Sequence, residues 1–257
     1  MKEKLPLSVS IISFNEEGNI ERLLKSVVEF ATEIVVVDSH STDRTREIAE
    51  SYGARVFEED WKGHIDQKNS ALEKCTQEWI LSLDCDEEVS PELEASVHRA
   101  ISEGRYDGYK INRRTHYLGQ FLKHAWYPDR KLRLVKRSSK PHWAGYNPHD
   151  VLFVEGEVGS VSGDMYHYSY KGVEHHFVST VGYARLSAQS YAEKGKQFRL
   201  HKLLLNPPFA FFKRYIIQKG FLDGQRGLVV AFSTFLNVFL KYLFLWEINF
   251  KKQDKKE

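Results

Sequence analysis

The amino-acid sequence predicts an α/β protein in which helices flank a mostly parallel sheet and a helical appendage follows at the C-terminal end. Through residues 7–83, short apolar runs alternate with amphipathic stretches, as expected of parallel strands joined by crossover helices. Polar clusters follow three of these apolar runs, at the strand ends where such sheets bind ligands. The 257 residues suffice for one large α/β domain and an appendage.

The first part of the chain is expected to supply four strands and three helices. Residues 7–13 form a buried first strand, and Asn19 caps a helix with apolar side chains at 20, 23, 24, 27 and 28. The remaining elements are a strand at 34–37, a helix from Ser41 or Thr42 to Gly53, a strand at 54–57, a helix at 65–75 and a strand at 79–83.

The strand at 79–83 ends in four carboxylates within five residues: Asp84, Asp86, Glu87 and Glu88. Carboxylates repel one another and are rarely buried unpaired, so this cluster favours a cation, and hard oxygen ligands suit Mg²⁺ or Mn²⁺. Alternatively, the acids simply begin the next helix, with Ser90 as its N-cap and Pro91 as its first residue. That explanation covers Glu88 at most, because the strand ends earlier.

Residues 14–17, 38–40 and 84–86 all follow predicted strands. In a parallel sheet the carboxyl ends of the strands meet at one edge, so the three polar clusters converge there. The sequence therefore predicts a ligand site at that edge.

These clusters resemble glycosyltransferase family 2, which has the GT-A fold. Residues 9–17 resemble its nucleotide-binding start, residues 35–43 its "VVDxxSTD" strand, and residues 84–87 its "DxD" metal motif. Residues 67–69 resemble its "ARN" element, with Lys68 in place of Arg. Three further segments, 126–134, 143–150 and 167–170, narrow the resemblance to bacterial lipopolysaccharide core glucosyltransferases. The resemblance covers about residues 7–170. That subfamily commonly has His-Glu where this chain has His149 and Asp150, and the wider family often has Asp in place of Ser39.

The resemblance implies an inverting, metal-dependent transfer of a hexose from UDP-glucose to a lipopolysaccharide-core or other lipid-linked acceptor. Such a reaction needs a rigidly held donor, stabilisation of the departing diphosphate and a base for the attacking hydroxyl. A polyprenyl-phosphate sugar transferase and a non-catalytic sugar-nucleotide-binding membrane scaffold are the alternatives.

The implied site has three groups of residues. Asp86 is the first choice for contact with Mg²⁺ or Mn²⁺, Asp84 lies nearer the ribose or holds a metal-bound water, and His167 completes the metal or diphosphate site. The donor-binding residues are Ser13, Asn15, Glu16, Asp38, Lys68 and Asp84. Asp150 is the candidate general base and His149 the second choice.

Each assignment has a plainer alternative. Lys68 could be a solvated helical lysine, His167 a strand residue between tyrosines, and Asp150 a surface aspartate in a turn. The cations at 113, 114, 130, 131 and 133 suit a phosphorylated acceptor, but exposed strand faces would give the same pattern.

The C-terminal region differs from the rest in charge and hydropathy. Residues 199–257 contain 11 Lys or Arg and four Asp or Glu, while the whole chain carries only +2. We therefore expect a catalytic domain at 1–198 and a basic, hydrophobic helical region at 199–257. Residues 228–246 contain one charge, Lys241, which forms a polar stripe with Ser233 and Asn237. The stripe favours a helix lying in a membrane interface, and a helix packed in a homo-oligomer or on its own chain is the rival.

Composition bounds the location and the partners. The two cysteines, Cys75 and Cys85, offer neither a disulfide framework nor metal-ligand spacing, and the N-terminus shows no signal-peptide pattern. We expect a cytoplasmic protein, peripheral on the inner face of the cytoplasmic membrane. Nucleic acid is not an expected partner, because the body is acidic and the basic residues are interleaved with aliphatic stretches.

Overall fold

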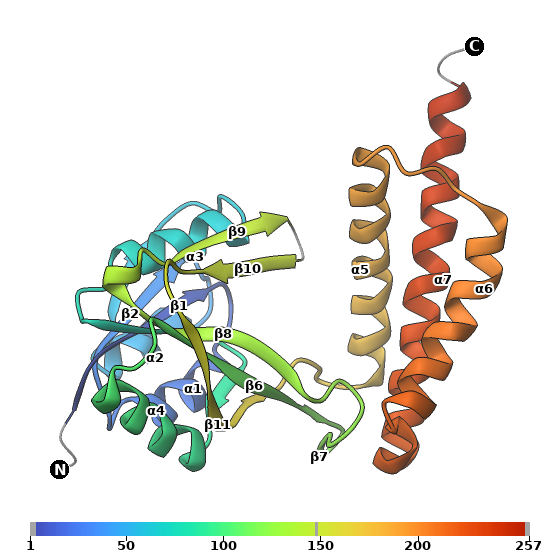
Figure 1. The fold of residues 1–257 in the computed structure, drawn as a ribbon. Coiled ribbons are helices and arrows are strands. Elements are labelled where there is room, and N and C mark those ends of the chain that lie inside the picture. The colour runs from blue at the N-terminus through green and yellow to red at the C-terminus, as the bar shows by residue number, and fades with distance from the viewer. Residues whose placement is uncertain (1–3, 147–148, 255–257) are drawn as a thin grey trace. The chain divides into compact units, whose positions relative to one another are not determined.

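The computed structural model describes residues 4–146 and 149–254, apart from the side chains of Tyr146, His149 and residues 252–254. The chain forms two compact units (Figure 1). Unit 1 comprises Met1–Arg114 and Asp129–Tyr168, and unit 2 comprises Thr115–Pro128 and Ser169–Glu257.

Unit 1 contains one large sheet whose first half is parallel. Its parallel strands are β1 (Leu5–Ser13), β2 (Ala31–Asp38), β3 (Arg55–Glu58) and β4 (Trp79–Asp84), in the order β3-β2-β1-β4. The sheet continues through β8 (Asp129–Lys136), β6 (Gly108–Tyr117), β11 (Val158–His167) and β5 (Glu87–Val89). In this half, β8 runs antiparallel to β4 and β6, and β11 runs antiparallel to β5. The predicted α/β class is confirmed.

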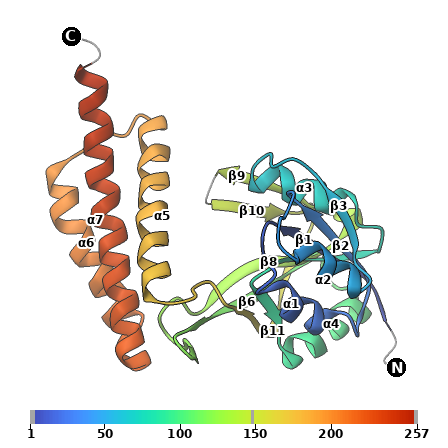
Figure 2. The same ribbon diagram turned by 180° about the vertical axis from the view of Figure 1, so that it is seen from behind.

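Both faces of the sheet are covered, so the central strands are buried along most of their length. On one face, side chains such as Val36 and Leu81 pack with α1 (Ile20–Val27), α2 (Thr45–Ser51) and α4 (Pro91–Glu103). On the other face, Val35 and Ile80 pack with α3 (His64–Glu73) and the hairpin of β9 (His142–Tyr146) and β10 (His149–Phe153). Figure 2 shows α3 and this hairpin together from behind. The short helix η1 (Arg137–Ser139) follows β8.

One expected helix start is corrected, and two are confirmed. Asn19 is the N-cap of α1 as predicted, although its side chain makes no capping hydrogen bond and contacts Glu16 and Arg22. Helix α2 begins at Thr45, later than expected, because Ser41 and its neighbours are held by side chains at the strand ends. Ser90 caps α4 as predicted by accepting a hydrogen bond from the Leu93 amide.

Unit 2 is built around three helices: α5 (Val173–Glu193), α6 (Leu200–Phe212) and α7 (Gly224–Asp254). A π-helical turn, η2 (Lys213–Ile217), and a 3₁₀ turn, η3 (Gly220–Asp223), join α6 to α7. Helix α7 packs against both α5 and α6 and lies between them (Figures 1 and 2). Helix α5 thus packs with the helical unit, although the sequence suggested a boundary near residue 198. Whether residues 1–198 act as the catalytic domain stays a prediction.

Residues 115–128, which contain β7 (Gln120–Phe121), belong to unit 2, where polar contacts attach them to its helices. The Asp223 carboxylate accepts hydrogen bonds from the amides of residues 123, 124 and 125 at 2.7–2.9 Å. Arg226 donates to the carbonyls of Tyr117 and Leu118. The Tyr117 hydroxyl lies 2.8 Å from Nδ1 of His176, whose pKa falls to about 4 because it is buried.

Candidate active site

The strand ends bring the predicted donor-binding residues together at one edge of unit 1. Ser13 lies opposite Asp38 in the β1–β2 register, and Asp84 lies opposite Ile12 in the β1–β4 register. The sheet topology therefore places Ser13, Asp38 and Asp84 on three adjacent strands, as the sequence predicts.

Asp38 is fully buried and joins the first two strand ends. Its carboxylate accepts hydrogen bonds from the Ser13 hydroxyl at 2.7 Å and from the Ser41 amide at 2.7 Å. The Asn15 amide donates to the Ser41 hydroxyl, and the Asn15 side-chain oxygen accepts from the Thr42 amide. Asn15 has a φ of 53°, a left-handed conformation that Asn tolerates better than most residues. Asp38 thus has a structural role in shaping this turn.

Glu16 continues the same turn. Its amide donates to the Thr45 hydroxyl at 2.7 Å, and its carboxylate accepts from the Asn19 side chain at 2.8 Å. These contacts fasten the loop after β1 to the start of α2.

Lys68, on α3, connects two of the predicted site carboxylates. Its Nζ lies 3.0 Å from Oδ1 of Asp84 and 2.9 Å from Oδ2 of Asp150. The Lys68 side chain is only 9% exposed, which contradicts the alternative of a solvated helical lysine. A cation that is out of water needs such anionic partners. The helix, β4 and β10 therefore meet at this lysine.

Arg133, on β8, extends the network on the other side of Asp84. Its Nη2 lies 2.8 Å from Oδ2 of Asp84 and 3.3 Å from Oε1 of Glu87. Glu87 is fully buried, and its other oxygen accepts a hydrogen bond from the Asp84 amide. Arg113 also approaches Glu87, at 3.7 Å. Charges of opposite sign thus alternate from Asp150 to Arg113.

The network shifts the pKa values of its members. Burial would raise the pKa of Asp84, but the charges of Lys68 and Arg133 hold it well below its usual range. Burial likewise opposes ionisation of Asp150, yet Lys68 lowers its pKa by charge and hydrogen bonding. Burial raises the pKa of Glu87, and the charge of Arg133 partly offsets that rise. Asp84 and Asp150 are therefore carboxylates at neutral pH.

Asp86 and His167 form a separate pair. The Asp86 carboxylate lies 3.3 Å from Nε2 of His167, which ends β11. No group of three or more His, Cys, Asp or Glu with metal-site spacing occurs among residues 4–146 and 149–254. A carboxylate and an imidazole suit Mn²⁺ or Mg²⁺ only if phosphate oxygens and water fill the other positions, which is how these ions usually bind. The pair fits a metal shared with a diphosphate. Asp84 is the weaker candidate ligand, since both of its oxygens already contact cations.

The β9–β10 hairpin carries Asp150 and is fixed to α3. The Asn69 side chain accepts from the Trp143 amide at 2.7 Å and donates to the Trp143 carbonyl at 3.0 Å. The Lys68 ammonium also lies 4.3 Å from the centre of the Trp143 ring. Lys68 and Asn69 therefore orient the base candidate. His149 begins β10, but its side chain lies outside the description, so its role stays a prediction.

Sequence reasoning gave Glu87 only a place in the acidic cluster and did not assign Arg133 to the site. It placed Arg133 in a patch for a phosphorylated acceptor or on an exposed strand face, whereas Arg133 is 3% exposed. The four acids within five residues were the available signal, because buried carboxylates require cations nearby. The basic middle segment is largely neutralised from within: Arg113 pairs with Asp129 and Arg114 with Asp164.

The motifs and geometry agree with a comparison to known protein families. The profile of the family described as Glycosyl transferase family 2 matches residues 8–153, more than half of the chain. The chain belongs to glycosyl transferase family 2. The matched range contains every site element described above except His167.

Relatives of this family-2 chain match it over nearly the full length. It is 31% identical over 267 residues to the lipopolysaccharide core biosynthesis glycosyltransferase LpsC of Rhizobium meliloti (strain 1021), covering 94% of this chain and 95% of LpsC. An uncharacterised glycosyltransferase of Rickettsia typhi is 30% identical, covering 96% of this chain and 89% of the relative.

Solved structures confirm the GT-A glycosyltransferase fold. The S. aureus TarS structure aligns with a TM-score of 0.51 and 16% identity, over 93% of this chain and 55% of that one. The mannosyltransferase PcManGT from Pyrobaculum calidifontis, in complex with GDP-Man and Mn²⁺, aligns with a TM-score of 0.50 and 15% identity, over 100% of this chain and 89% of that one. The family match and the LpsC relative, rather than these structures, show that the chain is a glycosyltransferase.

Proposed function

We propose that this enzyme is an inverting, metal-dependent hexosyltransferase that moves glucose from UDP-glucose to a lipopolysaccharide-core or other lipid-linked sugar. The carrying observation is the position of Lys68, within 3.0 Å of both Asp84 and Asp150. This lysine joins the carboxylate of the proposed donor site to the carboxylate of the proposed base.

Asp150 acts as the general base in this proposal. An inverting transfer needs one group that accepts the proton of the attacking hydroxyl. It proceeds without a covalent intermediate. Asp150 is ionised and partly exposed, and it is held in place by Lys68 and by the hairpin. The donor diphosphate would give Lys68 another anionic partner, and Lys68 would then hold Asp150 less tightly.

Asp86 and His167 would hold the divalent cation together with the diphosphate. When bound, such a cation supplies Lewis-acid stabilisation of the departing nucleoside diphosphate. Ser13, Asn15 and Asp38 support donor binding by shaping the turn at the first two strand ends. Asp84 contributes by fixing Lys68 and Arg133 in place beside the donor.

The printed name of a relative supports the proposed acceptor class, and the resemblance of the sequence motifs to family 2 supports the proposed donor. LpsC, which matches 94% of this chain, is described as a lipopolysaccharide core biosynthesis glycosyltransferase. Structures of similar fold hold different nucleotides: TarS was solved with UDP, and PcManGT with GDP-Man. The donor therefore has to be tested directly. A lipid-linked acceptor would place the enzyme at the inner face of the cytoplasmic membrane.

The donor experiment incubates the purified enzyme and Mn²⁺ with labelled UDP-glucose, UDP-galactose, GDP-mannose or dTDP-glucose and with truncated core lipopolysaccharide. We expect label on the core from UDP-glucose and no comparable signal from the other donors. Transfer from GDP-mannose alone would contradict the donor assignment. Label on polyprenyl phosphate, with none on the core, would contradict the acceptor assignment.

A further inference from the structure

Residues 200–222 of unit 2, which we call the α6 surface, expose an unusual amount of apolar side chain. Nine large apolar side chains in this range are between 45% and 65% exposed: Leu200, Leu204, Leu205, Phe209, Phe212, Ile216, Ile217, Phe221 and Leu222. Within α6, only Pro207 is buried. Contiguous exposed apolar surface of this kind marks an interaction site.

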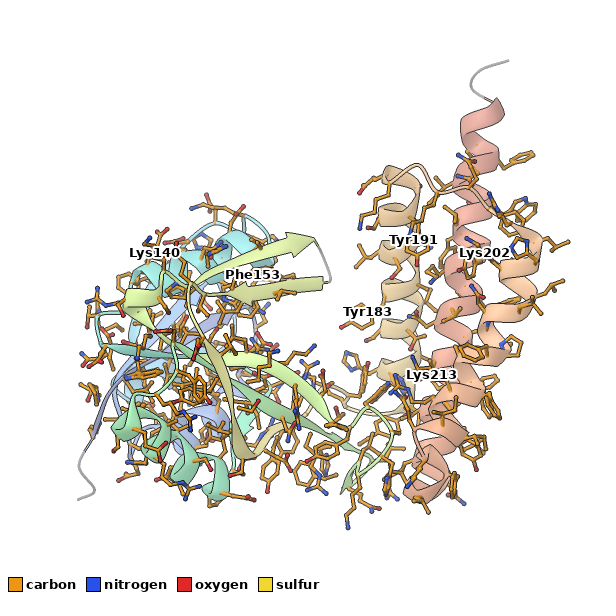
Figure 3. All side chains as sticks on the ribbon, viewed as in Figure 1. Lys140, Phe153, Tyr183, Tyr191, Lys202 and Lys213 are labelled. Carbon is orange, nitrogen blue, oxygen red and sulfur yellow. The ribbon has the colours of Figure 1, made fainter. Side chains whose placement is uncertain are left out.

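The α6 surface is also strictly basic. It contains four cations, Lys202, Lys213, Arg214 and Lys219, and no Asp or Glu. Figure 3 labels Lys202 and Lys213 within the helical unit. The next acid, Asp223, is buried and accepts hydrogen bonds from three backbone amides. The partner that fits this surface is therefore both apolar and anionic.

Helix α7 is a weaker candidate for membrane contact, although residues 220–251 are long and apolar enough to cross a bilayer. Its polar stripe faces α5: the Asn237 side chain donates to the Thr180 carbonyl, and the Lys241 ammonium lies 4.7 Å from the centre of the Tyr191 ring. Figure 3 shows Tyr191 on the α7 side of α5. Helix α7 packs against both α5 and α6, where side chains such as Val230 and Leu245 are buried. The polar stripe is therefore covered by α5, as the rival expectation has it, and contact of α7 with a membrane stays a prediction.

We propose that the α6 surface lies flat on an anionic lipid bilayer, with its apolar side chains in the headgroup region and its lysines against lipid phosphates. Amphipathic helices bind membranes in this way when apolar burial and cationic attraction act together. A symmetric dimer through the same surface would bring four cations against four, with no acid on the surface to compensate. The proposal rests on the membrane location suggested above, but not on the identity of the reaction.

The first test compares two triple variants of the full chain in sedimentation with vesicles of phosphatidylcholine and phosphatidylglycerol. Leu204→Gln, Leu205→Gln and Phe209→Gln together should weaken vesicle binding by more than roughly 100-fold, because three exposed apolar side chains no longer enter the bilayer. The matched control, Val178→Gln, Val181→Gln and Leu186→Gln, removes exposed apolar side chains of α5 and should bind like the wild type. Equal loss in both variants, with unchanged thermal unfolding, would overturn the proposal.

The second test concerns the cations. Lys213→Gln with Lys219→Asn should weaken binding roughly fivefold for each lysine at low salt. Asn suits position 219 because Lys219 has a φ of 56°. The loss should vanish on vesicles of phosphatidylcholine alone. Binding that depends on neither lipid charge nor salt would overturn the electrostatic part of the proposal.

The third test locates the contact directly. Both native cysteines are buried, and burial raises the pKa of Cys75 to about 12, so a thiol label should react with one introduced cysteine. An environment-sensitive dye on Phe212→Cys should shift to the blue when vesicles are added, and a dye on Val178→Cys should not. If the wild type ignores vesicles but is a dimer that the triple α6 variant dissociates, the occupant is a second copy and the proposal is wrong. UDP-glucose binding should remain unchanged throughout, which separates this result from failure of the proposed reaction.

Discussion

At the residue scale, the side chain of Lys68 lies between two carboxylates with different proposed tasks. It is nearly buried, and its ammonium contacts both Asp84 and Asp150 within 3.0 Å. Interactions of this kind are stronger in a partly buried setting than in water, so they can control protonation. Lys68 therefore keeps Asp150 ionised, but the lowered pKa makes Asp150 a weaker base.

Replacing Lys68 should change the pH dependence of transfer. Lys68 lowers the pKa of Asp150 in the donor-free enzyme, so Lys68→Met should raise that pKa and move the acid limb of kcat/KM for the donor to higher pH. The control, Lys68→Arg, keeps the charge and should leave the acid limb near its wild-type position. An unchanged acid limb in Lys68→Met would show that Asp150 is not the titrating base.

Removing Arg133 should destabilise unit 1. Arg133→Met leaves buried Glu87 without its closest cation, which should cost about 3–5 kcal/mol in the free energy of unfolding. The matched control on the same strand is Arg130→Met, which changes an exposed residue and should cost less than about 0.5 kcal/mol. Urea unfolding measures both variants.

The loss of stability in Arg133→Met should depend on pH. Without Arg133 the raised pKa of Glu87 should rise further, because burial is then less offset. A carboxyl whose folded pKa exceeds its unfolded value loses stability as pH rises through that interval. The defect of Arg133→Met should therefore be smaller near pH 4 than at pH 7. An equal defect at both pH values would contradict a buried ion pair.

Single residues show how far sequence reasoning reaches. Asp38, Asp84 and Asp86 could be placed because each follows an apolar strand. Arg133 could not, because its burial depends on β8 lying between β4 and β6, and that pairing is not encoded near residue 133. The proximity of Asp150 to Lys68, 82 residues apart, likewise depends on tertiary packing.

At the element scale, the β9–β10 hairpin connects the proposed base to α3. The Asn69 side chain forms hydrogen bonds with both the amide and the carbonyl of Trp143, as a neighbouring strand would do for β9. The sequence flagged residues 67–69 only by resemblance. The structure gives a physical reason for an amide side chain at position 69, since it must donate and accept at once.

Loss of that clamp should reduce catalysis with little effect on donor binding. Asn69→Ala should lower kcat roughly tenfold, since two hydrogen bonds of about 1 kcal/mol each position the hairpin. Hydrogen exchange of the Trp143 amide should speed up in parallel. Ser70→Ala is the control, because the Ser70 hydroxyl contacts Glu59 instead. Faster exchange with wild-type kcat would separate the hairpin from catalysis.

The polar stripe of α7 shows why an element's environment is hard to predict. Ser233, Asn237 and Lys241 form a stripe that suits either a membrane interface or a packed neighbour. The neighbour is α5, through contacts such as Asn237 with Thr180, 57 residues away. Periodicity indicates that a face is polar, but it does not identify the element that covers it.

At the scale of the whole molecule, the chain leaves unit 1 within β6, contributes residues 115–128 to unit 2, and returns to unit 1 at the start of β8. Composition alone placed the boundary near residue 198, where the basic region begins. In the structure α5 packs against α7 and so belongs to unit 2. The composition of α5 does not change sharply from that of the preceding residues, so composition could not reveal this. A chain ending near residue 198 would therefore leave the α7-facing side of α5 uncovered.

Transfer should require a divalent metal ion. Chelation with EDTA should abolish transfer, and Mn²⁺ or Mg²⁺ should restore it. Asp86→Ala should reduce transfer even in excess metal, since it removes the carboxylate that pairs with His167. Full transfer in EDTA would remove the cation from the proposed mechanism.

The central claim is that the strand-end network of unit 1 transfers a hexose with Asp150 as the base. The most direct measurement compares wild type and Asp150→Asn for transfer of labelled glucose from UDP-glucose to core lipopolysaccharide, with UDP-glucose affinity measured in parallel. We predict a loss of roughly 10²–10⁴-fold in transfer, because Asn cannot accept the hydroxyl proton, at nearly unchanged donor affinity. Wild-type transfer by Asp150→Asn would contradict the account.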